Sequence, residues 1–123
     1  MSVLIVDDNP DNLKLMVYVL TKAGHRVRTA VDAEQALELV RQDPPRLILM
    51  DVQLPGMDGL SLTRLLKAGA DTRDILIIAV TAYAMKSDEA RGFAAGCDGY
   101  ISKPINTRTL PQIVAEYLAR AAG

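Results

Sequence analysis

The stretch Leu47-Ile48-Leu49-Met50-Asp51 decides the fold class of this chain. Its four large apolar residues follow the breaker pair Pro44-Pro45, which predicts a strand buried on both faces. The strand ends on a carboxylate, and turn residues follow directly in 55–59. Because an open parallel sheet binds ligands beyond the carboxyl ends of its strands, Asp51 lies where a functional site is expected.

Strand patterns and helix patterns alternate along the whole chain. Apolar or alternating runs predict further strands at 3–6, 26–30, 75–80 and 100–102. Apolar residues at helical spacing predict a helix after each of these strands and after the strand at 47–51. This alternation predicts an α/β fold, in which helices cover both faces of a parallel sheet through right-handed crossovers. We expect a single domain spanning residues 1–123.

Capping residues indicate where several helices begin and end. Asn9 is placed as an N-cap before a proline at the first helical position, and Gly24 ends that helix. Asp32 and Gln35 have the spacing of a capping box at the second helix. Asn106 is expected to open the last helix.

Composition excludes several classes of protein. The 123 residues carry a net charge of −1, so direct binding of nucleic acid is not expected. Cys97 is the only cysteine, which excludes an internal disulfide and suits a reducing compartment. No apolar run approaches the roughly 20 residues of a membrane span, and the amino terminus lacks a signal-peptide pattern. We therefore expect a cytoplasmic protein without membrane contact.

Four of the five predicted strands end on polar side chains, namely the pair Asp7-Asp8, then Asp51, Thr81 and Lys103. Singly, each has an ordinary structural explanation, such as acids favouring the start of a helix. Together at one sheet edge, however, three carboxylates repel one another and require protons or a cation. Oxygen ligands without histidine or thiolate favour Mg²⁺, with Mn²⁺ as the alternative.

The same residues suit phosphoryl transfer. A carboxylate can act as the nucleophile and form an aspartyl-phosphate. The transferred group spreads negative charge over its oxygens, so the reaction needs a metal, a cation and a hydroxyl donor. Lys103 and Thr81 supply the cation and the hydroxyl, which makes Asp51 the candidate acceptor.

Four stretches of the chain resemble the receiver domains of two-component response regulators. They are 3–9, 47–59, 79–82 and 100–104, and their order and separations fit that family across the chain. Segments 81–85 and 102–105 are most similar to receivers of stand-alone cell-division regulators and of hybrid kinases. The resemblance implies a flavodoxin-like, doubly wound (βα)5 fold whose parallel strands follow the order 2-1-3-4-5.

The resemblance also implies how the acidic residues act. Asp51 would accept a phosphoryl group from a phosphohistidine on a histidine kinase or a histidine phosphotransfer protein. Asp8 and Asp51, with the backbone carbonyl of Gln53, would coordinate Mg²⁺. Asp7 would act mainly through a metal-bound water.

The remaining implied roles form a switch. Lys103 would pair with one phosphoryl oxygen, and the peptide between Lys103 and Pro104 would be cis. Thr81 would move to hydrogen-bond another oxygen, and Tyr100 would rotate inward with it. This motion would alter the surface formed by the predicted helix 86–95, the fifth strand and the last helix, where a downstream protein partner would bind.

Three further residues are expected to tune the switch. Gln53 and Tyr83 would flank the path of water to the phosphoryl group, and we expect Tyr83 to shield the group and lengthen its lifetime. Gly92 lies inside the predicted helix 86–95 and costs it about 1 kcal/mol relative to alanine, so we expect this helix to be among the mobile elements.

Other functions compete with this interpretation. A receiver-shaped binding module that is never phosphorylated would not need the full acidic set. A phosphatase of the haloacid dehalogenase type needs a second acid two residues after the nucleophile, where Gln53 stands. A nucleotide-binding protein would carry a glycine-rich loop after the first strand, and none follows. We therefore expect a signalling protein without separate substrate turnover.

The sequence indicates least about how the switch passes its signal to a downstream partner. No effector domain follows the last predicted helix in these 123 residues. We expect the chain to act alone by docking on a partner, as a monomer or a weak homodimer. The alternative is a chain cut from a longer regulator.

Overall fold

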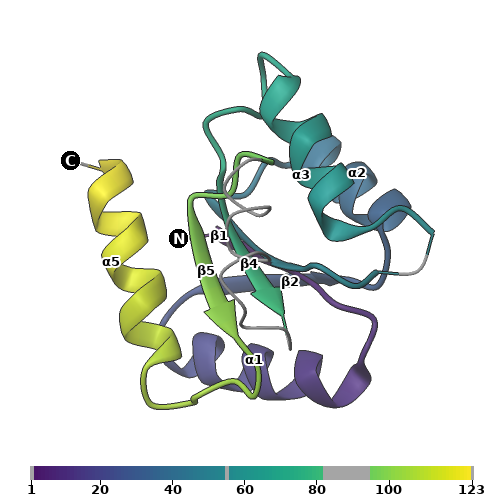
Figure 1. The fold of residues 1–123 in the computed structure, drawn as a ribbon. Coiled ribbons are helices and arrows are strands. Elements are labelled where there is room, and N and C mark those ends of the chain that lie inside the picture. Colours follow the sequence, from purple (N-terminus) through teal and green to yellow (C-terminus); the bar gives the residue numbers. More distant parts are fainter. Residues whose placement is uncertain (1, 55, 82–94, 123) are drawn as a thin grey trace.

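The computed structural model describes residues 2–54, 56–81 and 95–122 (Figure 1). The elements follow one another in the order predicted from the sequence. They are β1 (Ser2–Val6), α1 (Pro10–Lys22), β2 (Arg26–Ala30), α2 (Ala33–Gln42), β3 (Leu47–Asp51), α3 (Gly59–Ala68), β4 (Leu76–Thr81), β5 (Gly99–Ser102) and α5 (Leu110–Ala122).

The strands form one parallel sheet with β3 at its centre. The order is β2-β1-β3-β4-β5, which confirms the predicted α/β fold and its 2-1-3-4-5 arrangement. All residues of β3 are buried, as its unbroken apolar run requires. Val6 of β1 lies opposite Met50, and Asp51 lies opposite Val80 of β4. The carboxyl ends of these strands therefore reach the same edge.

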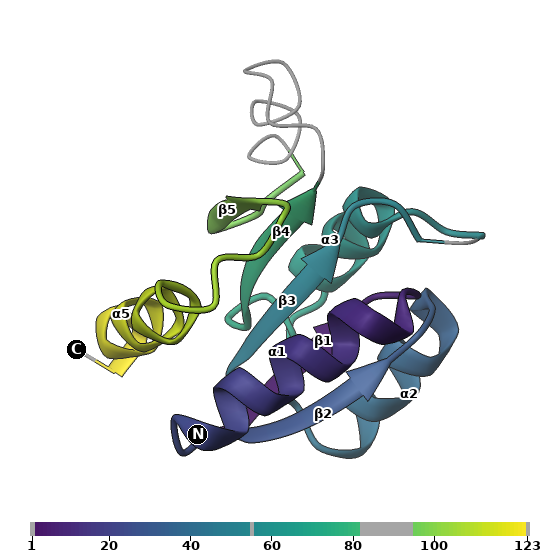
Figure 2. The same cartoon turned by 90° about the horizontal axis from the view of Figure 1, so that it is seen from below.

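Helices cover the sheet on both faces, and the strand pleat divides the core into two clusters. Figures 1 and 2 show α1 and α5 on one side of the sheet and α2 and α3 on the other. Successive side chains of a strand point to opposite faces. The cluster under α2 and α3 contains Leu4, Val6, Ile48, Met50, Ile77 and Ala79 from the strands. The cluster under α1 and α5 contains Val3, Ile5, Leu47, Leu49, Ile78 and Val80.

The predicted caps at Asn9, Gly24 and Asp32 are confirmed, whereas the capping box is only half formed because Gln35 Oε1 accepts from the Val31 N–H rather than from Asp32. The side chain of Asn9 accepts hydrogen bonds from the backbone N–H groups of residues 11 and 12. Gly24 has a φ of 95°, and its N–H donates to the carbonyl of Thr21 at 3.0 Å. The N–H of His25 donates to the Leu20 carbonyl at 3.1 Å, which completes a Schellman ending. Asp32 caps α2 by accepting from the N–H of residue 35 at 2.7 Å.

The start of α5 differs from the prediction. The helix begins at Leu110 rather than at Asn106. The side chain of Asn106 accepts from the N–H groups of Arg108 and Thr109, so it stabilises a turn over 107–109. Its carbonyl accepts from the Leu110 N–H at 3.0 Å. Asn106 therefore caps the turn that precedes α5 rather than the helix itself.

Some expectations fall on residues that the structure does not describe. These are the shielding role of Tyr83 and the helix predicted over 86–95, of which only Ala95 is described. A bilayer span would need a longer apolar helix than any in the described part of the chain.

Candidate functional site

The predicted site residues come from the ends of four strands. Asp7 and Asp8 follow β1, Asp51 ends β3, and Thr81 ends β4. The last residue of β5 lies opposite Thr81, so Lys103 follows at the same edge. The structure brings these ends together because parallel strands point in the same direction.

Three carboxylates form the acidic part of the site. One oxygen from each of Asp7, Asp8 and Asp51 lies within 4.8 Å of the others. Asp7 and Asp51 are only 1% and 3% exposed, whereas Asp8 is exposed. Buried carboxylates this close repel one another and require a proton or a cation. The oxygen-only donor set suits a hard divalent cation such as Mg²⁺.

Asp7 offers a specific sign that the site is built for a cation. Its Oδ1 accepts a hydrogen bond from the Asn9 N–H at 2.8 Å. Within the described residues, its buried Oδ2 has no hydrogen-bond partner. Leaving a buried polar atom unpaired costs free energy, so native structures rarely do so without a functional reason. A cation or its bound water would satisfy this oxygen.

Lys103 reaches the carboxylates from β5. Its Nζ lies 3.4 Å from Asp51 Oδ2 and 3.7 Å from Asp7 Oδ2. Its backbone N–H donates to the Thr81 carbonyl at 2.7 Å, and the peptide to Pro104 is cis. The backbone of Lys103 is thus tied to β4, while its ammonium is held between two acids at distances longer than good hydrogen bonds.

The protonation of Asp51 reflects its surroundings. Burial raises the pKa of this carboxyl above its ordinary value. The N–H of Gln53 donates to Oδ1 at 3.0 Å and lowers the pKa. The negative charge of Asp7 raises it, and the ammonium of Lys103 lowers it. An added cation would favour the ionised form, which is the form that acts as a nucleophile.

The other predicted residues lie around this centre. Thr81 is buried, and Gln53 is exposed beside the acidic cluster. Tyr100 is half-buried on β5 and packs against the cluster under α2 and α3. Tyr83 lies outside the described residues.

One neighbour of Asp51 was not predicted. Gly59, quoted above only as a turn residue, begins α3, and its Cα lies against the backbone carbonyl of Asp51. The sequence contains a weak signal for this contact. Asp58 is an N-cap, which places the glycine at the first helical position directly after a short loop from β3.

Comparison with known proteins identifies the family. A family model described as the response regulator receiver domain matches residues 3–115. This chain is a receiver domain. It is 43% identical over 120 residues to the polar-differentiation response regulator DivK of Brucella ovis, and the match covers 98% of each chain. The predicted resemblance to receivers of cell-division regulators is confirmed.

Solved structures of receiver domains have the same fold. A putative response regulator from Chloroflexus aurantiacus J-10-fl superposes with a TM-score of 0.92 at 34% identity, covering 97% of this chain and 98% of that one. The receiver domain of a sensor histidine kinase from Pseudomonas aeruginosa PAO1 has a TM-score of 0.88 at 34% identity, covering 96% and 97%. That structure has a magnesium ion coordinated in its active site cleft.

Membership of the family fixes the general chemistry. Receiver domains of two-component response regulators bind Mg²⁺ at a cluster of aspartates, and Asp7, Asp8 and Asp51 form such a cluster here. Receiver domains interact with histidine kinases and with downstream partners. They are signalling proteins rather than classical enzymes.

Proposed function

We propose that this receiver domain is a phosphorylation-dependent switch in which Asp51 accepts a phosphoryl group from a phosphohistidine. One observation carries the proposal: a buried carboxylate ends the central strand, beside the Lys103 ammonium and a buried Asp7 oxygen that accepts no hydrogen bond from the described residues. This arrangement supplies the charges that a transferring phosphoryl group requires.

The transfer follows from the side chains present. A carboxylate oxygen of Asp51 forms a bond to phosphorus while the bond from phosphorus to the donor imidazole breaks. Lys103 lies close enough to pair with an oxygen of the new phosphoryl group, and the Thr81 hydroxyl would donate to another. Asp7, Asp8, Asp51 and the carbonyl of Gln53 would hold Mg²⁺, which neutralises charge on the transferred oxygens.

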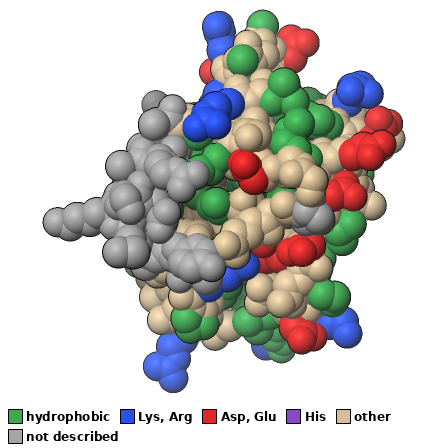
Figure 3. Space-filling view, turned by 45° about the vertical axis from the view of Figure 1, so that its right-hand side comes forward, with side chains coloured by type: hydrophobic (Ala, Val, Ile, Leu, Met, Phe, Trp, Pro, Cys, Tyr) green, Lys and Arg blue, Asp and Glu red, His purple; other side chains and the backbone are tan. Residues whose placement is uncertain are grey.

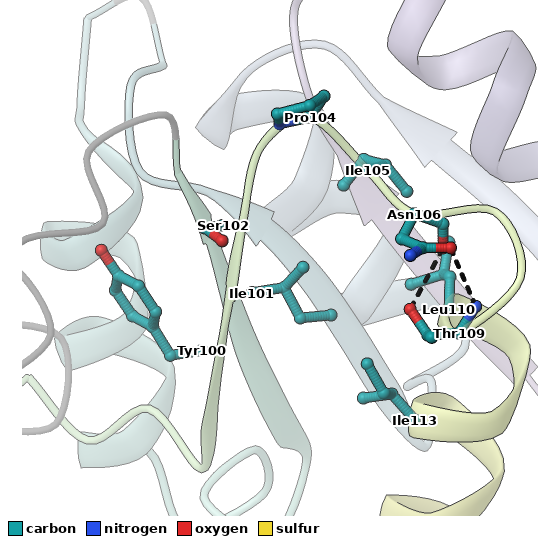
Figure 4. Close-up of a pocket in the computed structure, with 9 residues that line it drawn as sticks. All are labelled: Tyr100, Ile101, Ser102, Pro104, Ile105, Asn106, Thr109, Leu110 and Ile113. Carbon is teal, nitrogen blue, oxygen red and sulfur yellow. Dashed lines mark hydrogen bonds between the residues drawn. The ribbon is translucent and has the colours of Figure 1, made fainter.

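The switch would act on the surface around β5 and α5. A cavity of about 300 Å³ opens there, lined by residues of β5, the following loop and α5. Figure 4 shows Ile101, Ile105 and Ile113 on one side of β5 and Tyr100 on the other. A change at Tyr100 would therefore alter the strand that forms one wall of this cavity. We propose that a downstream protein partner binds at this surface.

The surface as a whole is mixed in character. Figure 3 shows hydrophobic side chains lying among separated acidic and basic ones. The exposed large hydrophobic residues in the described part of the chain are Leu15, Tyr18, Val31, Met57 and Leu65. We propose a cytoplasmic protein whose partners are a histidine kinase or phosphotransfer protein and a downstream protein, with residues 1–123 acting as one domain.

A direct experiment is phosphorylation by a small phosphodonor. The parent protein, incubated with acetyl phosphate and Mg²⁺, should gain the mass of one phosphoryl group. Asp51→Asn should abolish the gain, and chelation of Mg²⁺ with EDTA should prevent it.

The matched control is Asp58→Asn. Asp58 lies in the same loop region and caps α3 through the Ser61 N–H, a role that asparagine can also fill. This variant should be phosphorylated like the parent. If the parent gains no mass, or if the gain survives Asp51→Asn, the protein is better described as a binding module with a receiver fold.

A further inference from the structure

The first residue of α3 touches the end of the central strand. A Cβ added at Gly59 would lie 2.9 Å from the carbonyl carbon of Asp51 and 3.0 Å from Cα of Val52, and closer still to the Asp51 carbonyl oxygen. All three atoms belong to the backbone, so no side chain can rotate away. The contact exists only because residue 59 has no side chain.

Hydrogen bonds hold this contact on both sides. The N–H of Gly59 donates to the Val52 carbonyl at 3.0 Å, and the N–H of Val52 donates to the Val80 carbonyl at 3.1 Å. The buried hydroxyl of Thr63 donates to the Gly59 carbonyl at 2.8 Å. The start of α3 is therefore bonded to the residue that follows Asp51, and that residue is bonded to β4.

We infer that Gly59 is a positioning residue for the phosphoryl acceptor, because its contact fixes the Asp51 backbone and with it the carboxylate. This role rests on the function proposed above. The site depends on the spacing of Asp51 from Lys103, now 3.4 Å between Nζ and Oδ2, and from Asp7. A methyl group at residue 59 would force α3 and β3 apart by roughly 1 Å, a displacement that can cost up to about 100-fold in rate.

The test compares Gly59→Ala with two other glycine substitutions. Gly69→Ala lies at the opposite end of the same helix, where the new Cβ would meet the rotatable Thr72 hydroxyl at 2.6 Å. In Gly99→Ala, the new Cβ would lie 2.6 Å from Cζ of Tyr117. This variant shows what a loss of stability alone does to the site. Mg²⁺ affinity and the rate of phosphorylation by acetyl phosphate are measured at a temperature where each variant is folded.

We expect Gly59→Ala to weaken Mg²⁺ binding and slow phosphorylation by about 10-fold or more. Gly69→Ala and Gly99→Ala should stay within about twofold of the parent, whatever their melting temperatures. Parent-like values for Gly59→Ala would overturn the positioning role, as would an equal loss in Gly99→Ala. A variant that is partly unfolded is measured in trimethylamine N-oxide, which favours the compact state.

The outcomes also separate the two proposals. If the parent protein is not phosphorylated, the proposed function fails. If the parent is phosphorylated and Gly59→Ala behaves identically, only the role of Gly59 fails. If Gly59→Ala stays unfolded even with the osmolyte, the contact is a requirement of folding, and the positioning role is overturned.

Discussion

Two lysines of this domain are equally buried but are bound very differently. The side chains of Lys67 and Lys103 are each 20% exposed. The Lys67 ammonium donates to Asp98 at 2.8 Å and to two backbone carbonyls of the connection from α3 to β4 at 2.8 and 3.2 Å. The Lys103 ammonium lies 3.4 and 3.7 Å from its nearest carboxylate oxygens, on Asp51 and Asp7.

The difference separates an ion pair that is completed by hydrogen bonds from the ion pair at the proposed site. An ammonium has three donors, and all three are used at Lys67. Its partner Asp98 also accepts from the Ile77 N–H at 2.8 Å, which fixes the approach to β5 beside β4. Within the described residues, Lys103 contacts two carboxylates, at 3.4 and 3.7 Å. Under the proposed function, its ammonium would turn to an oxygen of the phosphoryl group.

Replacing Lys67 should produce the largest loss of stability. Lys67→Met removes three donors and leaves the Asp98 carboxylate with the Ile77 N–H as its one donor among the described residues. The free energy of unfolding should therefore fall by about 2–3 kcal/mol in urea denaturation. The Asp98 side chain is 33% exposed, which moderates the loss. Mg²⁺ should not restore the stability.

The matched control for Lys67 is a surface lysine. Lys22 contacts the exposed Tyr18, through a hydrogen bond of 3.2 Å and a ring contact. Lys22→Met should change the free energy of unfolding by no more than about 0.5 kcal/mol. Equal changes in the free energy of unfolding for Lys22→Met and Lys67→Met would show that the ion pair of Lys67 with Asp98 adds nothing to stability.

Replacing Lys103 should have a smaller effect that depends on metal. Lys103→Met leaves Asp7 and Asp51 without their cation, so stability should fall by about 1–2 kcal/mol when Mg²⁺ is absent. Added Mg²⁺ should recover most of this loss in the same urea titration, because a cation again compensates the two acids. A deficit that Mg²⁺ leaves unchanged would place Lys103 in the same structural class as Lys67.

The smallest expected effect concerns pH and Asp51. Because burial raises the pKa of Asp51 above 3.8, the folded chain holds this proton more tightly than the unfolded chain. The stability that the proton confers is complete below pH 3.8 and is lost as pH rises through the raised pKa. At neutral pH without Mg²⁺, Asp51→Asn should therefore be more stable than the parent by an amount on the order of 1 kcal/mol.

The pH profile checks this sign. The stability difference between Asp51→Asn and the parent should close as pH falls toward 4 and should also shrink when Mg²⁺ is added. A difference that stays constant with pH would mean that the raised pKa of Asp51 has no part in it. The control Asp58→Asn should match the parent at neutral pH, because asparagine caps a helix about as well as aspartate.

Much of the fold could be predicted because its signals are local. The buried run at 47–51 and the capping residues Asn9, Gly24 and Asp32 act within a few positions of the chain. The predicted start of the last helix at Asn106 is wrong because this signal is also local. The Asn106 side chain caps a turn over 107–109 instead of the helix. Leu65 fits the helical pattern of α3 but is 49% exposed, because it lies beyond the edge of the apolar face.

The residues of the candidate site could be predicted from the sequence, but the contacts that hold the surrounding backbone could not. Parallel topology places the strand ends at one edge, which is why Asp7, Asp51 and Lys103 could be grouped from the sequence. The pair of Lys67 and Asp98 joins residues 31 positions apart, and no periodicity indicates it. The contact at Gly59 depends on the distance between two backbones, which no pattern of residue types encodes.

The central position of β3 has a consequence for how long Asp51 stays in its site. The strand is hydrogen-bonded to β1 on one edge and to β4 on the other, and all of its residues are buried. Amide protons in such a strand exchange with solvent only when the whole domain opens. The Asp51 backbone therefore leaves the sheet only when the domain unfolds globally. Any substitution that raises the population of the globally open state, even on a distant helix, exposes Asp51 in the same proportion.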